Sequence, residues 1–138
     1  MVQSSEIKFK TRGAGDIVNL TPDLEKIIRE GEIDSGVVTI FTPSATSGLT
    51  TLEYEPGLLR DLPQLLEEMI PSDRKYYHDE TWHDGNGFSH LRAALIGPSL
   101  SVPFTASQLT LGTWQQVVFL EFDNRPRQRR VSLQIIGE

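Results

Sequence analysis

Residues Thr113 to Phe122, TWQQVVFLEF, decide the fold that this sequence predicts. Because successive side chains of a β-strand point to opposite faces, this segment is apolar on both of its faces. The apolar residues of one face are Trp114, Val118, Leu120 and Phe122, and those of the other face are Val117 and Phe119. A strand that is apolar on both faces is either central in a sheet or covered by another subunit. We therefore expect a fold built around this strand.

Shorter segments around it also have the composition of strands, with β-branched residues or apolar residues at every second position. They are residues 7–11, 16–20, 36–42, 49–54, 100–104, 108–111 and 129–136. The polar stretch Asp123-Asn124-Arg125-Pro126 predicts a turn, and we expect it to join 113–122 and 129–136 into one long hairpin.

Helical spacing predicts three short helices. The first spans Pro22 to Glu30, with Thr21 as its expected N-cap. The second runs from Leu58 to Met69, where Pro63 implies either a kink or a restart of the helix. The third covers residues 90–96. The fold class is therefore α+β, dominated by antiparallel sheet with two to three helices, in a single domain over residues 1–138.

Composition excludes several classes of function. The 138 residues contain no cysteine, so thiolate metal ligands and thiol nucleophiles are absent. Thirteen basic against 19 acidic residues give a net charge of −6, which opposes nucleic-acid binding. The amino terminus lacks the apolar core of a signal peptide, and no apolar run reaches the ~20 residues that span a bilayer. We expect a cytoplasmic protein without membrane contact.

Residues 71–89 form the segment most typical of a functional site, because the segment is long, polar, aromatic and without a steady period. All three histidines of the chain, His78, His83 and His90, lie in or next to it, and Asp84 follows His83 directly. Imidazole and carboxylate groups together suit divalent ions such as zinc. These four residues are the candidate metal ligands, and the candidate ions are zinc and magnesium. The alternative is a set of exposed loop histidines without a ligand.

A loop of small hydroxyl residues precedes one predicted strand, and Ser44 and Thr46 in it could bind phosphate through their O–H groups. Its alternative is an ordinary turn. Glu53 lies on the strand that follows and is a candidate base or ligand. Four arginines crowd residues 125–130, and their forked guanidinium groups suit phosphate or carboxylate. A charged hairpin tip in water is the alternative for the arginines.

The sequence resembles the YjbQ-like family over essentially the whole chain. The resemblance rests on His78, on Asn86, on the segment HLRAALIG at residues 90–97 and on LGTWQQ at residues 111–116. It implies a small α+β protein with a β-sandwich-like core that assembles as a homotrimer. Members are labelled secondary thiamine-phosphate synthase. His78, Asn86 and His90 match the polar positions of the family's central motif, and Glu53 matches its acid.

The chain departs from the family's pattern, since many members carry asparagine where this chain has Leu52 and histidine where it has Ser44. It resembles a subgroup with serine or threonine there, and His83 is the candidate replacement imidazole. Pyrophosphate chemistry usually requires magnesium held by oxygen ligands, whereas imidazoles favour zinc-like ions. The activity that the label names can therefore be incidental to another role.

Together these patterns predict a small enzyme that acts on a phosphorylated or anionic small molecule. His78, His90 and Glu53 are its expected catalytic groups, and we expect them to lie close together. The expected substrate-binding residues are Asn86, Ser44, Thr46, Arg127, Arg129 and Arg130. The alternative function is a trimeric protein that binds a metal or an anion without catalysis.

Overall fold

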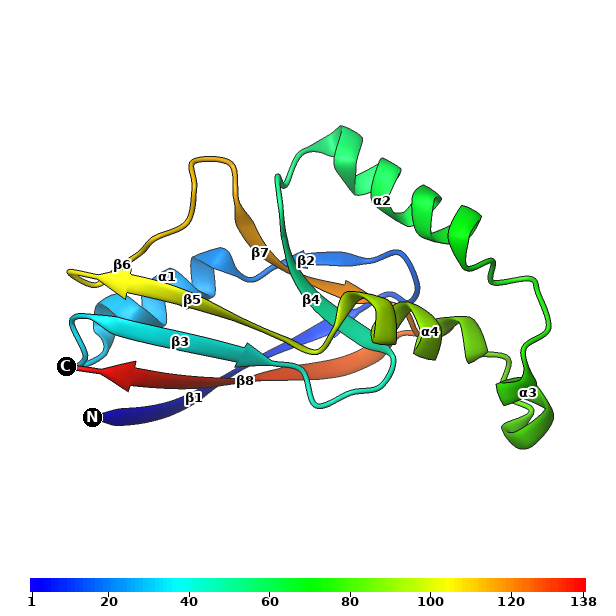
Figure 1. Cartoon of the computed structure of the whole chain (residues 1–138), viewed down its shortest axis with the longest axis horizontal. Coiled ribbons are helices and arrows are strands. Elements are labelled where there is room, and N and C mark those ends of the chain that lie inside the picture. Colours follow the sequence, from blue (N-terminus) through cyan, green and yellow to red (C-terminus); the bar gives the residue numbers. More distant parts are fainter.

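The computed structural model describes residues 1–138 and shows two antiparallel sheets with four helices. The larger sheet has the strand order β1 (Val2–Thr11), β8 (Arg127–Gly137), β3 (Gly36–Phe41), β5 (Ser99–Thr105) and β6 (Gln108–Leu109). The smaller sheet has the order β2 (Ile17–Asn19), β7 (Gln116–Glu121) and β4 (Ser47–Leu52). The α+β class with antiparallel sheets is confirmed (Figure 1).

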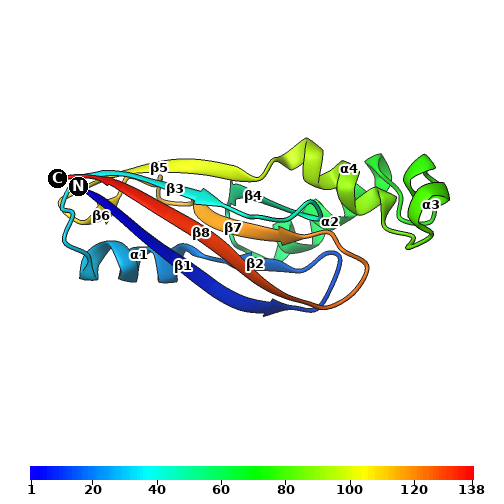
Figure 2. The same ribbon diagram turned by 90° about the horizontal axis from the view of Figure 1, so that it is seen from below.

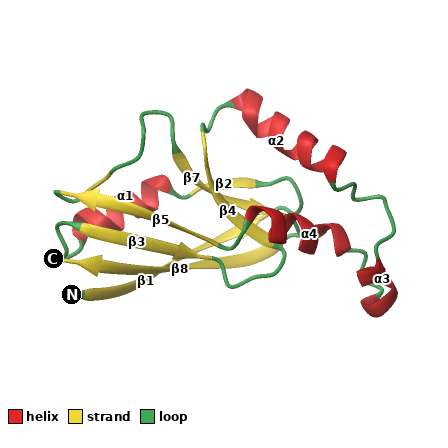
Figure 3. Cartoon of the chain, viewed as in Figure 1, coloured by secondary structure: helices red, strands yellow, loops and turns green.

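The helices divide the molecule into two regions. Helix α1 (Thr21–Glu30) packs beside the larger sheet, as Figure 2 shows. Helices α2 (Pro56–Met69), α3 (Tyr77–Trp82) and α4 (Gly87–Ile96) gather at the end of the molecule opposite the termini (Figure 3). We call residues 56–96 the helical arm and the remaining chain the body. No helix has the length and apolarity required to cross a membrane.

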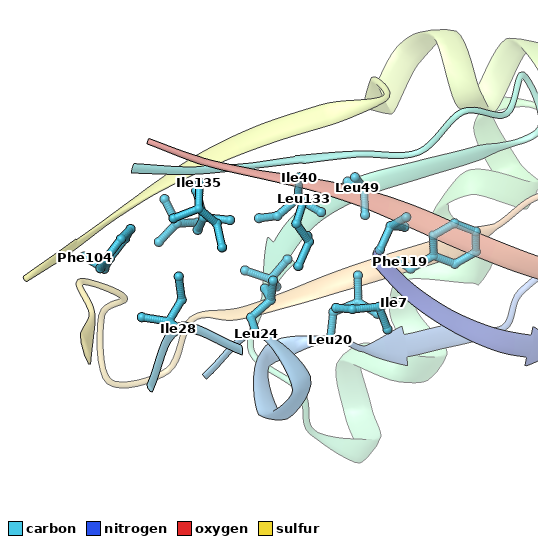
Figure 4. Close-up of a cluster of buried hydrophobic side chains, with 14 of the residues drawn as sticks. Ile7, Leu20, Leu24, Ile28, Ile40, Leu49, Phe104, Phe119, Leu133 and Ile135 are labelled. Carbon is cyan, nitrogen blue, oxygen red and sulfur yellow. The ribbon is translucent and has the colours of Figure 1, made fainter. Parts of the chain in front are cut away.

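Strand β7 is buried on both faces within its own chain, as its sequence predicts. Val117 and Phe119 enter a cluster of fifteen buried side chains between the larger sheet, α1 and β4 (Figure 4). Val118 and Leu120 enter a second cluster of six, which includes Leu66 of α2. Trp114 departs from the prediction, because it lies before the strand and is 71% exposed.

The predicted hairpin of residues 113–136 is wrong in its pairing. β7 pairs with β2 and β4, whereas β8 pairs with β1 and β3 in the other sheet. The turn therefore carries the chain from one sheet to the other. Side chains replace the expected backbone ladder, since Arg129 on β8 binds Glu121 on β7 through two hydrogen bonds of 2.8 and 2.6 Å.

The helix boundaries also correct the sequence prediction. Thr21 lies inside α1 and does not cap it, because its hydroxyl accepts a hydrogen bond from the Val117 N–H at 2.7 Å. Helix α2 continues through Pro63 and begins at Pro56, with the Glu55 carboxylate accepting from two backbone N–H groups. Helix α3 lies in the segment that the sequence predicts to be a loop.

Candidate functional site

The two predicted catalytic histidines lie against each other where α3 meets the start of α4. The ring centroids of His78 and His90 are 4.4 Å apart, with an angle of 37° between the ring planes. Each imidazole comes from a different helix, so the contact depends on how α3 packs on α4. Gly87 permits that packing, because a Cβ there would stand 2.7 Å from the Cβ of Tyr76.

Asp79 and Asp84 bring two carboxylates to His78. His78 Nδ1 lies 3.8 Å from Asp79 Oδ1 and 3.6 Å from Asp84 Oδ1. One possible ligand atom from each of the three residues lies within 4.8 Å of the others. His78 Nδ1 is buried but makes no hydrogen bond, which is unusual for a buried polar atom. The sequence predicts Asp84 as a ligand but not Asp79.

Asp79 is held rigidly by backbone groups. Its carboxylate accepts hydrogen bonds from the N–H of Tyr76 at 3.2 Å and of Gly87 at 3.1 Å. The hydrogen bond from Tyr76, followed by the one from Gly87 and the electrostatic effect of the nearby His78, lowers the pKa of Asp79 against the opposing effect of burial. Asp79 is therefore ionised and positioned beside His78 at neutral pH.

His90 has a lowered pKa. Partial burial is the largest cause, and the nearby His78 adds to it, whereas Asp84 and Asp123 oppose it. A lowered pKa favours the neutral imidazole, which can accept a proton.

The turn after β7 completes the polar environment from the body. Asp123 is buried and binds Arg127 Nε at 2.6 Å. Burial raises the pKa of Asp123, but hydrogen bonds from Arg127, Asn124 and Asn86 outweigh burial and lower that pKa. Asn124 Nδ2 donates to the Asp84 carbonyl oxygen at 2.9 Å, which connects this turn to the helical arm.

Asn86 lies between two acids. Its Nδ2 donates to Asp123 Oδ1 at 3.3 Å, and with the amide oxygen and nitrogen exchanged it would donate to Asp84 Oδ1 at 2.9 Å. In either orientation the amide fixes a carboxylate next to the histidines. Its predicted place near the site therefore agrees with the geometry, as does that of Arg127.

Three of the other candidate residues, Ser44, Thr46 and Arg129, form one cluster. Ser44 and Thr46 meet Arg129, which donates to their hydroxyl groups at 2.8 and 2.9 Å. The same guanidinium is saturated by Glu121, so this cluster is a buried ion pair within the chain. Glu121 and Asp123 were missed by the sequence analysis, although an acid inside the apolar run FLEF is a usable signal.

Arg130 and Glu53 lie apart from the histidine pair, and His83 is outside the group formed by His78, Asp79 and Asp84. Arg130 is on the outer face of the larger sheet, 3.7 Å from Glu6. His83 ends α3 with a left-handed backbone (φ 58°) and an exposed side chain. Glu53 is exposed beyond the end of β4 that pairs with Gln116. That end lies five residue steps, about 16 Å, from the end that pairs with Glu121.

Comparison with known proteins gives a consistent family. Residues 5–138 match the family model described as UPF0047 protein YjbQ-like. A UPF0047 protein of Archaeoglobus fulgidus is 40% identical over 126 residues, which cover 91% of this chain and 95% of that protein. The UPF0047 protein YugU of Bacillus subtilis is 30% identical over 133 residues, which cover 95% and 97% of the two chains.

Solved structures share the fold. A crystal structure of a YbjQ-like protein of unknown function from Sulfolobus solfataricus has a TM-score of 0.88 at 26% identity and covers both chains completely. An uncharacterised YjbQ/UPF0047 protein from Clostridium acetobutylicum has a TM-score of 0.81 at 30% identity, covering 94% of this chain and 99% of that one.

Proposed function

The chain belongs to the UPF0047 YjbQ-like family, and we propose that it is a small cytoplasmic enzyme with a divalent-metal site. In this proposal His78, Asp79 and Asp84 hold the ion, and the substrate is a phosphorylated or anionic small molecule. The observation that carries the proposal is the buried, unpartnered Nδ1 of His78, which lies between two carboxylates.

The spacing of these groups fits a metal ion. Ligand atoms that are each about 2.1 Å from a tetrahedral ion stand about 3.4 Å from one another. The distances of 3.6 and 3.8 Å from His78 Nδ1 to the two carboxylates are close to that value. One imidazole and two carboxylates suit zinc or manganese, and the oxygen ligands also accept magnesium. Such an ion supplies Lewis-acid polarisation to a substrate oxygen.

The residues around the site have separate roles in the proposed reaction. His90 is the proton acceptor, because its lowered pKa leaves it neutral near pH 7. Asn86 orients Asp84 or Asp123, and Asp123 holds Arg127. Arg127 is half-buried and is the guanidinium nearest to this network, so it is the candidate contact for an anionic group.

Zinc titration by calorimetry tests the metal site. We expect His78→Ala and Asp84→Asn to weaken zinc binding by more than the 10- to 100-fold that is typical of residues behind the ligands. His83→Ala is the matched control, because His83 is an exposed histidine on the same segment outside the cluster. If His83→Ala weakens zinc binding as much as His78→Ala does, the assigned ligand set is wrong.

Turnover separates catalysis from binding alone. Formation of thiamine phosphate, with release of pyrophosphate, is the first reaction to assay, because the family resemblance implies it. We expect His90→Gln to leave zinc affinity within about twofold and to reduce turnover of any substrate whose attacking group must lose a proton, since an amide of similar size cannot accept that proton.

A non-catalytic binding protein is the second candidate, and the arginine pairing favours it. Asp123 and Glu121 already engage the guanidinium groups of Arg127 and Arg129. An enzyme that expels pyrophosphate needs cationic groups free to stabilise the leaving charge. Metal binding without any turnover that depends on His90 would favour this second function.

We further propose that the chain assembles as a homotrimer. Strand β7 no longer supports this, because its own chain covers it. Other apolar side chains support it, since Leu65 and Met69 of α2 and Leu91 and Leu95 of α4 are each about half exposed. Light scattering at micromolar concentration should give three times the chain mass of 15.5 kDa. A monomeric mass would refute the assembly.

A further inference from the structure

Trp82 lies one helical turn from two of the proposed metal ligands. It follows His78 by four residues and Asp79 by three, and side chains at these spacings share one face of a helix. The hydrogen bond from the His83 N–H to the Asp79 carbonyl oxygen, at 2.9 Å, shows that this turn is α-helical. Long side chains on a helix lean back over the preceding turn, so the spacing places Trp82 on the helix face that carries His78 and Asp79.

The indole is nevertheless exposed. Trp82 is 69% accessible, although its helix is fixed at both ends by hydrogen bonds to Asp79. A large aromatic ring held in water on an ordered helix beside a polar cluster is typical of a binding surface. Its neighbours in sequence, Glu80, Thr81, His83 and Asp84, are exposed and polar.

We propose that Trp82 is the stacking surface for a planar ring of the ligand, which makes the substrate class an anion that carries an aromatic or heteroaromatic ring. The inference rests on the proposed metal site, because the ion would hold the anionic group while the ring lies on the indole. The polar surroundings favour a single ring over a protein partner, since a tryptophan at the centre of a protein interface is surrounded by contacts that exclude water.

Tyr77 provides a matched comparison on the same helix. It is 88% exposed, but it precedes His78 by one residue, and neighbours at that spacing do not face each other. The proposal therefore assigns the ring to Trp82 and not to Tyr77.

The test compares two probes that share a phosphate group, phenyl phosphate and methyl phosphate, on the zinc-loaded protein. Trp114→Phe leaves Trp82 as the single tryptophan, because the chain has only two. Zinc has a filled d shell and does not take part in redox chemistry, which makes it the suitable ion for fluorescence. We expect phenyl phosphate to change the emission of Trp82 and to bind roughly tenfold more tightly than methyl phosphate.

Two variants then assign the preference to a residue, with affinities measured by calorimetry. Trp82→Leu should abolish the preference for phenyl phosphate while zinc and methyl phosphate bind as before, and Tyr77→Leu should change nothing. Equal affinities for the two probes, or a preference that survives Trp82→Leu, would overturn the inference. A third outcome would also overturn it: the emission of Trp82 is blue-shifted without ligand and shifts to the red when the protein is diluted. In that case a second copy of the chain covers the indole. Failure of zinc itself to bind would refute the proposed function, and this inference with it.

Discussion

The body and the helical arm are stabilised in different ways. The body closes on fifteen buried hydrophobic side chains from sheet and helix, whereas the cluster beneath the arm has six. In the arm, α2 has fourteen residues of which only Leu66 is buried and α3 has none, whereas α4 buries five of its ten residues. Since burial is the main source of folding free energy, α2 and α3 are the less stable part of the molecule.

Polar contacts add to the limited burial in the arm. Arg92 of α4 donates to the Ile70 carbonyl oxygen at 2.7 Å and to Glu67 at 2.7 Å, which ties α4 to the end of α2. Asp79 ties α3 to α4 through Gly87, and Asn124 ties the turn after β7 to Asp84. The histidine cluster lies within these ties, so the candidate site is built where structure depends on polar geometry rather than on packing.

The largest expected effect belongs to the body. Phe119→Ala removes a fully buried ring whose centroid lies 4.8 Å from that of Phe9. We expect it to lower the free energy of unfolding by about 3–5 kcal/mol, measured by urea denaturation. Phe119→Leu, which conserves most of the volume, should cost less than about 1.5 kcal/mol. A small loss for the alanine variant would contradict the assignment of the main core.

A smaller and local effect is expected in the arm. Arg92→Leu removes the donors to Ile70 and Glu67, and we expect it to cost about 2 kcal/mol in the local opening of α2 and α4. Amide hydrogen exchange should show the loss in the arm, with β8 amides unchanged. Arg92→Lys keeps the positive charge but loses the forked guanidinium, so its stability should lie between those of the wild type and of Arg92→Leu. A uniform loss over both regions would mean that the arm and the body unfold as one unit.

Acidification should loosen the contact between α2 and α4. The Ser72 N–H, followed by the Arg92 side chain, lowers the pKa of Glu67 from 4.5 against the effect of burial. The unfolded chain therefore binds this proton at a higher pH than the folded chain does, so the contribution to stability is complete above pH 4.5. It is lost as the pH falls through the lowered value. Hydrogen exchange of α2 between roughly pH 5 and 3 checks this, and Glu67→Gln should remove the pH dependence.

The smallest effect is expected at Trp114, a large aromatic residue of the body that lies outside its core. Trp114→Phe should change the unfolding free energy by less than about 0.5 kcal/mol, because the indole is 71% exposed. The measurement is again urea denaturation, in dilute protein. A larger loss that grows with protein concentration would show instead that a partner chain covers this ring.

The sequence predicts the body better than the arm, for physical reasons. Strand β7 was predicted correctly because successive side chains of a strand point to opposite faces and the residues of both sets are apolar. The predicted pairing of β7 with β8 was wrong, since a turn sequence shows that the chain reverses but not which sheet the next strand joins. Helix α3 was missed because six residues, YHDETW, are too few to show an apolar period.

The candidate site was predicted in part. His78, His90, Asp84 and Asn86 lie together as expected, because one polar segment supplies them all. Asp123 comes from a turn 33 residues beyond His90, and only the tertiary fold brings it close. Arg129 lies on the same face of β8 as the buried Val131, because the two residues are two positions apart in the strand. The four arginines close together in the sequence nevertheless suggest an exposed cluster.

The double burial of β7 has a consequence for how the sequence can vary. On β8, inward and outward positions alternate, so a library of random substitutions should be tolerated at every second residue, as at Gln134 and Ile136. Along Val117 to Phe122 no position faces water. From Val117 to Leu120 successive residues pack into alternate clusters, whereas Glu121 pairs with Arg129. Among related sequences this strand should therefore change most slowly. A substitution in it should be accompanied by a compensating substitution in one or the other of the two clusters.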